Sequence, residues 1–335
     1  MAERPAAIRL VLAGADAADC LKALAADGGS VLAVFRRSLY LGHDGSGAMA
    51  CVGPAALGAG PLNALADPGG SVPDWQDAGL RPGDPIDPGN GGLRIGAAGA
   101  LSFAGARLHD PPRGPCAWTG ERLAAALARL SDALRGFDLD EGLAPLARPD
   151  GPALSSDSPL LRRARPAVSA LERWLAGDAD APPRNMVSGL IGLGPGLTPS
   201  GDDYLGGAMI ALIMSGRAED AASLASPALA MAAEGTNRIS AAHLRAAAKG
   251  LGADALHRSI DALARADDTA LAAGLRGLDA IGHSSGWDAL AGAVSALKAI
   301  GRGFAAQPAR SAAAVSAAPA LDSATTTPAS RNAST

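Results

Sequence analysis

The 335-residue chain lacks the features that mark several common protein classes. It has no basic run and no alternation of basic with aromatic residues, and its net charge of −4 argues against a nucleic-acid-binding surface. The three cysteines, Cys20, Cys51 and Cys116, are too far apart for a local metal motif or a disulfide framework, which favours a reducing cytoplasm. The five histidines also offer no pair at a metal-like local spacing.

Long apolar runs are missing as well. The start Met1-Ala-Glu-Arg-Pro is unlike a signal peptide, and Arg9 and Asp16 interrupt the apolar residues that follow it. The longest apolar segments are short and rich in glycine, so we expect no membrane span and a cytoplasmic protein. The hydrophobic content of 48% is nevertheless sufficient for a substantial core.

Two regions of different periodicity follow each other along the chain. Residues 1–117 alternate short apolar segments with Gly/Pro turns and predict a β-rich domain, either a barrel or a sandwich. Residues 118–304 have helical periodicity and predict a mostly α-helical domain, so the fold class is α+β. Residues 305–335 are rich in Ala, Ser, Thr and Pro without periodicity, which predicts a disordered tail.

The individual elements can be placed approximately. We expect strands within 30–41 and at 48–52, 63–65, 92–95 and 100–103, and a short helix at 16–26. We expect helices at 121–134, 160–175, 218–233, 238–249, 253–265, 267–276 and 286–302, with a loop-helix unit at 190–216. Thr119 is the expected N-cap of the first of these helices.

The most informative segment is 192–207, GLGPGLTPSGDDYLGG, which precedes an apolar helix. Its glycines and prolines are too dense for the interior of a helix or strand, so it predicts a shaped loop, with Ser200 or Asp202 capping the helix. Such a loop presents backbone N–H groups and the positive end of the helix dipole to a phosphate or carboxylate. The alternative is a turn that only leads the chain into a core helix.

Two better-known glycine-rich motifs can be excluded for this loop. It is not a Walker A motif, because no Gly-Lys-Ser/Thr follows. It is not a dinucleotide fingerprint, because the spacing of Gly192, Gly194 and Gly196 breaks the Gly-x-Gly-x-x-Gly pattern.

The loop has a partial repeat 85 residues later. Residues 199–212 align without gaps on 284–297, with the shared pattern Ser-Gly-x-Asp-x-Leu-x-Gly-Ala. Gly207 and Gly292 fall within the helical parts, where glycine costs about 1 kcal/mol relative to alanine, so we expect them to permit close helix-helix approach. We therefore predict that the two units pack side by side and that their Ser-Gly-x-Asp starts face one pocket.

A third polar cluster, Thr236-Asn-Arg-Ile-Ser240, lies between the repeats at the start of a predicted helix. Thr236 or Ser240 can cap this helix, and the forked guanidinium of Arg238 can bind an anion. The alternative is ordinary capping beside a solvated arginine.

These three motifs together resemble a bacterial family, formerly of unknown function, that includes the AllH subunit of oxamate carbamoyltransferase. The resemblance is specific over about 185–300, whereas over 1–115 only the order of a β-rich and then an α-helical region agrees. It implies a subunit of a multi-protein enzyme that transfers a carbamoyl group between oxalurate and phosphate, giving oxamate and carbamoyl phosphate. The implied partners are a succinyl-CoA-synthetase-like protein and a second subunit.

The sequence also differs from other carbamoyltransferases. The Ser-x-Arg-Thr-Arg phosphate motif of the aspartate and ornithine enzymes is absent, so carbamoyl transfer here would use a different scaffold. The open alternatives are a non-catalytic protein that binds a small anion or scaffolds its partners, and an unrelated small-molecule enzyme that reuses the loop.

The ligands that the resemblance implies are anions, which agrees with the loops. We assign catalytic roles to Asp203, Asp288 and Arg238: the carboxylates would orient an amide N–H or act as bases, and the arginine would compensate charge. No cofactor is certain; Asp202 and Asp203 could hold a divalent metal such as Mg²⁺, or the aspartates could be structural caps. The residues expected to bind the anion are Gly194, Gly196, Thr198, Ser200, Gly201, Thr236, Ser240 and Ser285.

Overall fold

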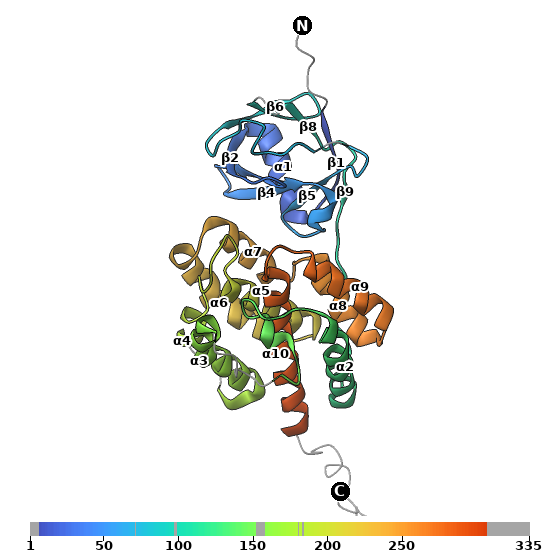
Figure 1. Cartoon of the computed structure of the whole chain (residues 1–335). Coiled ribbons are helices and arrows are strands. Elements are labelled where there is room, and N and C mark those ends of the chain that lie inside the picture. The colour runs from blue at the N-terminus through green and yellow to red at the C-terminus, as the bar shows by residue number, and fades with distance from the viewer. Residues whose placement is uncertain are drawn as a thin grey trace, which may run out of the picture.

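The chain folds into a β-barrel stacked on a helical domain (Figure 1). The computed structural model describes residues 7–70, 72–96, 99–151, 158–179, 181–182 and 184–306. The predicted disordered tail, 305–335, begins too early, because 305 and 306 are still helical; the rest of it lies outside the described residues. The α+β prediction is confirmed, and of the two β-rich alternatives the structure has the barrel. Within the described residues no helix is both long and apolar enough to cross a membrane.

The barrel is formed by strands that come mostly from consecutive hairpins. Among the described residues the strand order is β5-β4-β3-β2-β6-β7-β8-β1, and pairing of β1 with β5 closes the ring, while β9 runs parallel to the end of β1. The strands predicted from the sequence omit β1, β6, whose two prolines argue against a strand, and β9, which is very short. The strands are β1 (Ile8–Ala13), β2 (Gly29–Val34), β3 (Leu39–His43), β4 (Ala48–Gly53), β5 (Asn63–Ala66), β6 (Pro85–Gly89), β7 (Gly92–Ile95), β8 (Gly99–Ser102) and β9 (Arg107–Leu108).

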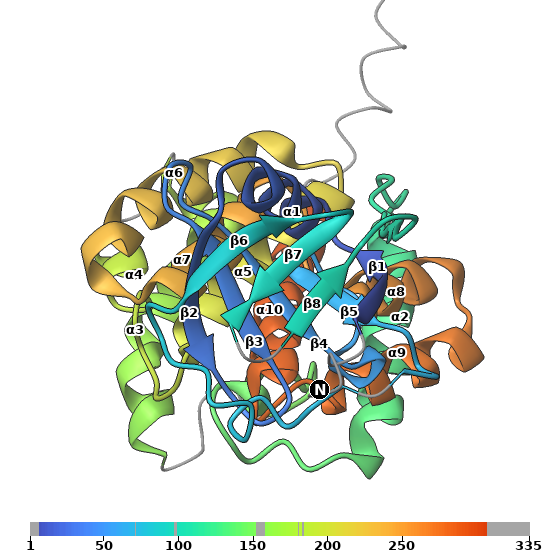
Figure 2. The ribbon, with the colours of Figure 1, turned by 90° about the horizontal axis from the view of Figure 1, so that it is seen from above.

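Helix α1 (Ala15–Asp27) contributes its buried side to the barrel core, where it packs mainly against β4 and β6. Strand alternation then decides which barrel residues face the helical domain. On β3, Leu39 and Leu41 belong to the barrel core, so Tyr40 between them points to the opposite face. Tyr40 and its cross-strand partner Cys51 therefore face the helices, which lie beneath these strands (Figure 2).

The helical domain is built around α5 (Ser200–Met214) and α10 (Ser285–Ala306), which form the most extensive helix pair. Nearly every residue of α5 is buried, which explains why this helix is apolar on all sides rather than amphipathic. The surrounding helices are α2 (Gly120–Ala133), α3 (Pro159–Arg173), α4 (Arg184–Ser188), α6 (Ala218–Gly235), α7 (Arg238–Ala248), α8 (Asp254–Arg265) and α9 (Asp268–Asp279).

The two repeated units do pack side by side, and their glycines are the reason. A Cβ at Gly207 would lie 1.8 Å from the carbonyl oxygen of Ala289, and a Cβ at Gly292 would lie 1.8 Å from that of Tyr204. Since these four residues are equivalent in pairs, each helix presents its glycine to the same turn of the other. The predicted role of Gly207 and Gly292 in close helix-helix approach agrees with this geometry.

The predicted helix caps are right in one case and wrong in two. Thr119 caps α2, because its side chain accepts a hydrogen bond from the N–H of Arg122. Neither Ser200 nor Asp202 caps α5, whose N-cap is Pro199, and α7 is capped by Asn237 rather than by Thr236 or Ser240. These caps are wrong because the side chains have tertiary partners. The hydroxyls of Thr236 and Ser240 donate to Asp202, so the three side chains connect α5 with the start of α7 instead of capping a helix.

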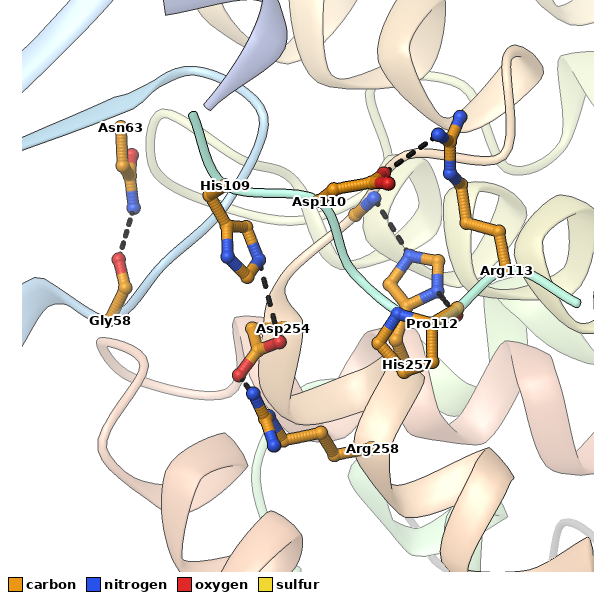
Figure 3. A network of polar contacts seen from close by, with 10 residues as sticks. Gly58, Asn63, His109, Asp110, Pro112, Arg113, Asp254, His257 and Arg258 are labelled. Carbon is orange, nitrogen blue, oxygen red and sulfur yellow. Dashed lines mark hydrogen bonds and ion pairs between the residues drawn. The ribbon is translucent and has the colours of Figure 1, made fainter. Parts of the chain in front are cut away.

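The barrel is held to the helical domain by apolar and polar contacts. Met49 and Leu62 of the barrel pack against Ile239 and Ala242 of α7. The connection after β9 carries His109, whose ring lies 3.4 Å from the carboxylate of Asp254 at the start of α8 (Figure 3). The barrel backbone also takes part, since the N–H of Asp254 donates to the carbonyl of Ala59.

His257 fixes the connection further along the chain (Figure 3). Its Nδ1 lies 2.9 Å from the carbonyl oxygen of Pro112, and its Nε2 accepts from the N–H of Gly252. A carbonyl can only accept and a backbone N–H can only donate, so this ring is neutral with its proton on Nδ1. Burial lowers the pKa of His257 to about 4, in agreement with that state.

Candidate functional site

A cavity of about 580 Å³ lies between the barrel and the helical domain. Its volume is in the range of small-molecule sites, which often lie at domain interfaces. Both domains contribute polar side chains to its walls. Those from the barrel are Arg37, Ser38, Tyr40, Cys51 and Asn63, and those from the helical domain include Thr198, Asp202, Asp203, Ser240, His243 and Ser285.

Only some of the sequence-predicted site residues reach this cavity. Those that line it are Thr198, Asp202, Asp203, Ser240 and Ser285. Those outside its lining are Gly194, Gly196, Ser200, Gly201, Thr236, Arg238 and Asp288. The cavity is therefore lined by Asp202 and Asp203 of the first Ser-Gly-x-Asp start and by Ser285 and Gly286 of the second, so the two starts do not face it equally.

Asp202 is the centre of a hydrogen-bond network that joins the three sequence motifs. Its Oδ1 accepts from the N–H of Gly192 at 2.8 Å. Its Oδ2 accepts from the hydroxyls of Thr236 at 2.5 Å and Ser240 at 2.7 Å. Three donors satisfy a buried carboxylate well. Asp202 therefore organises the loop and the start of α7, and its oxygens are already used.

Asp203 has a different environment, although it is the next residue. It keeps some accessible surface toward the cavity, but its Oδ2 is buried and has no hydrogen-bond partner among the described residues. Burial raises the pKa of Asp203 well above its usual value, and the charges of Asp288 and Asp202 raise it further, against a lowering by the hydroxyls of Ser285 and Thr198. The environment thus favours the neutral, protonated acid, which can donate a hydrogen bond.

Asp288 is the equivalent residue in the second unit, and its hydrogen bonds are satisfied. The N–H of Leu143 donates to its Oδ1 at 2.5 Å, and the hydroxyl of Ser284 donates to its Oδ2 at 2.8 Å. Burial raises the pKa of Asp288 to about 6, although hydrogen bonds from Ser200, Ser284 and the backbone oppose this shift. Its contacts make Asp288 an anchor for the segment around Leu143.

Hydroxyl side chains of each unit lie close to polar side chains of the other unit. The hydroxyl of Ser285 in the second unit lowers the pKa of Asp203 in the first, and that of Ser200 in the first lowers the pKa of Asp288 in the second. The hydroxyls of Thr198 and Ser285 also lie 2.7 Å apart. The serine of each unit therefore acts on the aspartate of the other, and of these two aspartates Asp203 lines the cavity while Asp288 does not.

The glycine loop is shaped as predicted, but not all of its N–H groups are free. Gly194 and Gly196 both have positive φ, which glycine adopts without strain. The N–H of Gly201 donates to the carbonyl of Leu193, so the predicted anion contact of Gly201 is replaced by a backbone hydrogen bond. Gly201 is required for another reason: a Cβ there would lie 2.0 Å from the carbonyl oxygen of Leu190.

Arg238 does not approach the cavity. It begins α7 with an exposed side chain, while Ser240 on the same helix turns toward Asp202. The metal hypothesis is also unsupported by the geometry, because the donors around Asp202 are N–H and O–H groups. Within the described part of the chain, no three His, Cys, Asp or Glu side chains are grouped to hold a metal ion.

Sequence reasoning missed the residues on the barrel wall and His243 of α7. Burial lowers the pKa of His243 to about 4, which leaves it neutral at physiological pH, and burial raises the pKa of the Cys51 thiol to about 11. Burial is also the largest cause that raises the pKa of Tyr40, and the Asp203 charge contributes. Alternation around Leu39 and Leu41 could have placed Tyr40 opposite the barrel core, but not opposite Asp203.

Comparison with known proteins identifies one family over this part of the chain. The family model described as oxamate carbamoyltransferase subunit AllH matches residues 190–297, which contain both Ser-Gly-x-Asp units and the Thr236–Ser240 cluster. This match confirms the resemblance drawn from the three motifs. No curated protein and no solved structure matches the chain.

Proposed function

We propose that the chain is a subunit of an oxamate-carbamoyltransferase-type enzyme and that the interdomain cavity holds its small anionic substrate. The family match over 190–297 supports the subunit assignment. The observation that carries the site is Asp203, an acid with a buried oxygen that lacks a partner among the described residues, in the wall of a cavity that the matched segment lines. The implied partners are a succinyl-CoA-synthetase-like protein and a second subunit.

Two neighbouring aspartates would repel an anionic ligand if both carried exposed charge. The structure removes most of this difficulty, because Asp202 is compensated by three hydrogen-bond donors and the environment of Asp203 favours its neutral form. The hydroxyls of Thr198 and Ser285 add two groups that can donate to a carboxylate or a phosphate. The helical wall is therefore compatible with an anion.

Asp203 can then act as the general acid of the proposed transfer. A phosphate oxygen attacks the carbamoyl carbon of oxalurate, the new C–O bond forms, and the C–N bond to the oxamate portion breaks. The departing nitrogen takes the proton of Asp203, and the proton of the attacking hydrogen phosphate restores the acid. The balanced products are carbamoyl phosphate and oxamate.

Reconstitution of the complex tests this proposal. Carbamoyl phosphate formation from oxalurate and phosphate should require this chain together with its two partner subunits, and the isolated chain should be inactive. Full turnover by the partners alone would contradict a role for the chain, and full turnover by the chain alone would contradict the subunit assignment. If the chain is required for assembly but Asp203→Asn turns over normally, it is a scaffold or a binding protein instead.

A further inference from the structure

Polar side chains of the barrel form one wall of the cavity that Asp203 lines from the helical domain. Tyr40 of β3 and Cys51 of β4 are directly paired in register, so their side chains lie next to each other on the outer face of the barrel. Both line the cavity that Asp203 and Ser285 line from the helical side. Residues from chain positions more than 150 apart thus meet around one space.

Tyr40 is held in place by its neighbours. Its side chain lies beside that of Cys51, its partner in register, on the face of the barrel that lines the cavity. Its ring makes an edge contact with Phe35 at 6.0 Å between centroids and packs against the apolar cluster that includes Ile239 of α7. A tyrosine fixed in this way stays in the wall of the cavity that Asp203 also lines, at little entropic cost.

Arg37 adds a positive charge to the same wall. Its side chain is exposed, and it forms no ion pair with the described residues. The neighbouring Arg36 is paired with Asp74 at 3.0 Å, and Arg258, the other arginine of the cavity lining, is paired with Asp254. Arg37 is therefore the arginine of this lining that remains available for a ligand carboxylate.

We infer that the β3–β4 face of the barrel, together with the adjacent Arg37, is the second half of the ligand site and binds both ends of the substrate, its carboxylate and its amide or carbamoyl group. The carboxylate binds Arg37 near the surface, and the amide lies deeper, between the Tyr40 hydroxyl and Asp203. This inference rests on the proposed function, for which it names the barrel residues that bind the substrate. It gives the barrel a direct role in substrate binding.

Oxamate, which carries both groups, is the probe for the test. Titration calorimetry with the full chain should give an affinity for oxamate that falls on the order of 10-fold or more in Arg37→Gln and about 5-fold in Tyr40→Phe. Acetamide, which lacks the carboxylate, should bind both the wild type and Arg37→Gln weakly and equally. In the reconstituted complex, Arg37→Gln should raise the KM for oxalurate more than it lowers kcat.

Matched controls come from the same residue types. Arg36→Gln removes a charge one residue away that is already paired, and Tyr204→Phe removes the hydroxyl of the second tyrosine, which does not line the cavity. Both should bind oxamate within about 2-fold of the wild type. Circular dichroism and melting temperatures establish that all four variants are folded.

Two results would overturn the inference and are distinguishable from each other. Unchanged oxamate affinity in Arg37→Gln and Tyr40→Phe, together with loss of binding in Asp203→Asn, would remove the barrel from the site and leave the proposed function intact. Unchanged affinity and turnover in all three variants, or no oxamate binding by the wild type, would remove the cavity from the proposed function as well.

Discussion

The two Ser-Gly-x-Asp units share a sequence pattern and pack against each other through equivalent glycines, but their aspartates have different surroundings. The start of α10 is covered by the segment around Leu143, whose N–H donates to Asp288. The start of α5 is covered by the barrel across a cavity, and Asp203 keeps an oxygen without a partner among the described residues. The repeat therefore determines the helix pair, whereas the segments packed against it determine which acid can act.

Gly142 shows how the second unit is closed. It has a φ of 59°, and a Cβ at this position would lie 2.5 Å from Oδ1 of Asp288. A glycine therefore allows the backbone to approach the carboxylate directly. The resulting contacts make Asp288 a structural anchor. Asp203, the equivalent residue of the first unit, instead borders a cavity large enough for a ligand.

The largest effect should come from removing the acid of the first unit. Asp203→Asn should lower carbamoyl phosphate formation by the reconstituted complex by roughly 100-fold or more, because an amide cannot supply a proton to a leaving nitrogen. Its melting temperature should not fall, since the substitution removes a carboxyl group that is costly to ionise in a buried site. Steady-state kinetics and thermal unfolding measure both quantities.

Asp288→Asn is the matched variant in the second unit. An asparagine oxygen can still accept from Leu143, so this variant should stay folded and retain turnover within about 10-fold. Equal losses of activity in the two variants would mean that the units are chemically equivalent, and the distinction between anchor and acid would then be wrong.

The next largest effect should come from disturbing the close contact between α5 and α10, to which both units contribute a glycine. Gly207→Ala and Gly292→Ala should each lower the free energy of unfolding by about 3 kcal/mol, because each new methyl group meets a carbonyl oxygen of the other helix. Gly206→Ala is the control: its Cβ would lie 3.4 Å from the Ala247 Cβ, and it should gain up to about 1 kcal/mol of helix propensity. Denaturant unfolding measures all three, and a large difference between the first two would disprove the symmetric packing.

The smallest effect is a pH dependence at Asp288. Burial raises its pKa in the folded chain from the ordinary value of 3.8 to about 6, so the folded state binds the extra proton between these values. Asp288 therefore contributes a loss of stability as pH rises from 3.8 to 6, and Asp288→Asn removes this loss. The stability of the wild type relative to this variant should fall by about 2 kcal/mol between about pH 4 and pH 7, as measured by denaturant unfolding.

Two buried histidines contribute a pH dependence of stability with the opposite sign, but they do not affect this measurement. Burial lowers the pKa of His243 and His257 to about 4, so their contribution is present above the ordinary value of 6.5 and is lost as pH falls toward 4. The wild type and Asp288→Asn both contain these histidines, so the histidine contributions cancel in the stability difference between the two proteins. A difference that stays constant across this range would mean that the pKa of Asp288 is not raised.

Much of the fold could be predicted from the sequence, because the signals were local. Apolar spacing marked the helices around α5 and α10, and the shared Ser-Gly-x-Asp-x-Leu-x-Gly-Ala pattern marked their packing through Gly207 and Gly292. The caps of α5 and α7 were not predictable in the same way. Asp202 and Ser240 have the side chains of cap residues, but a partner 38 positions away takes their hydrogen bonds.

The sequence by itself determined the order of a β-rich and a helical region, the paired loop-helix units and the family resemblance, because each depends on residues close together in the chain. Only the tertiary structure decided that the β-rich region is a closed barrel, that Tyr40 and Asp203 line one cavity, and that Asp203 rather than Asp288 borders it. The physical reason is that burial and hydrogen-bond partners come from distant segments. The same carboxyl group becomes an anchor or an available acid according to what packs against it.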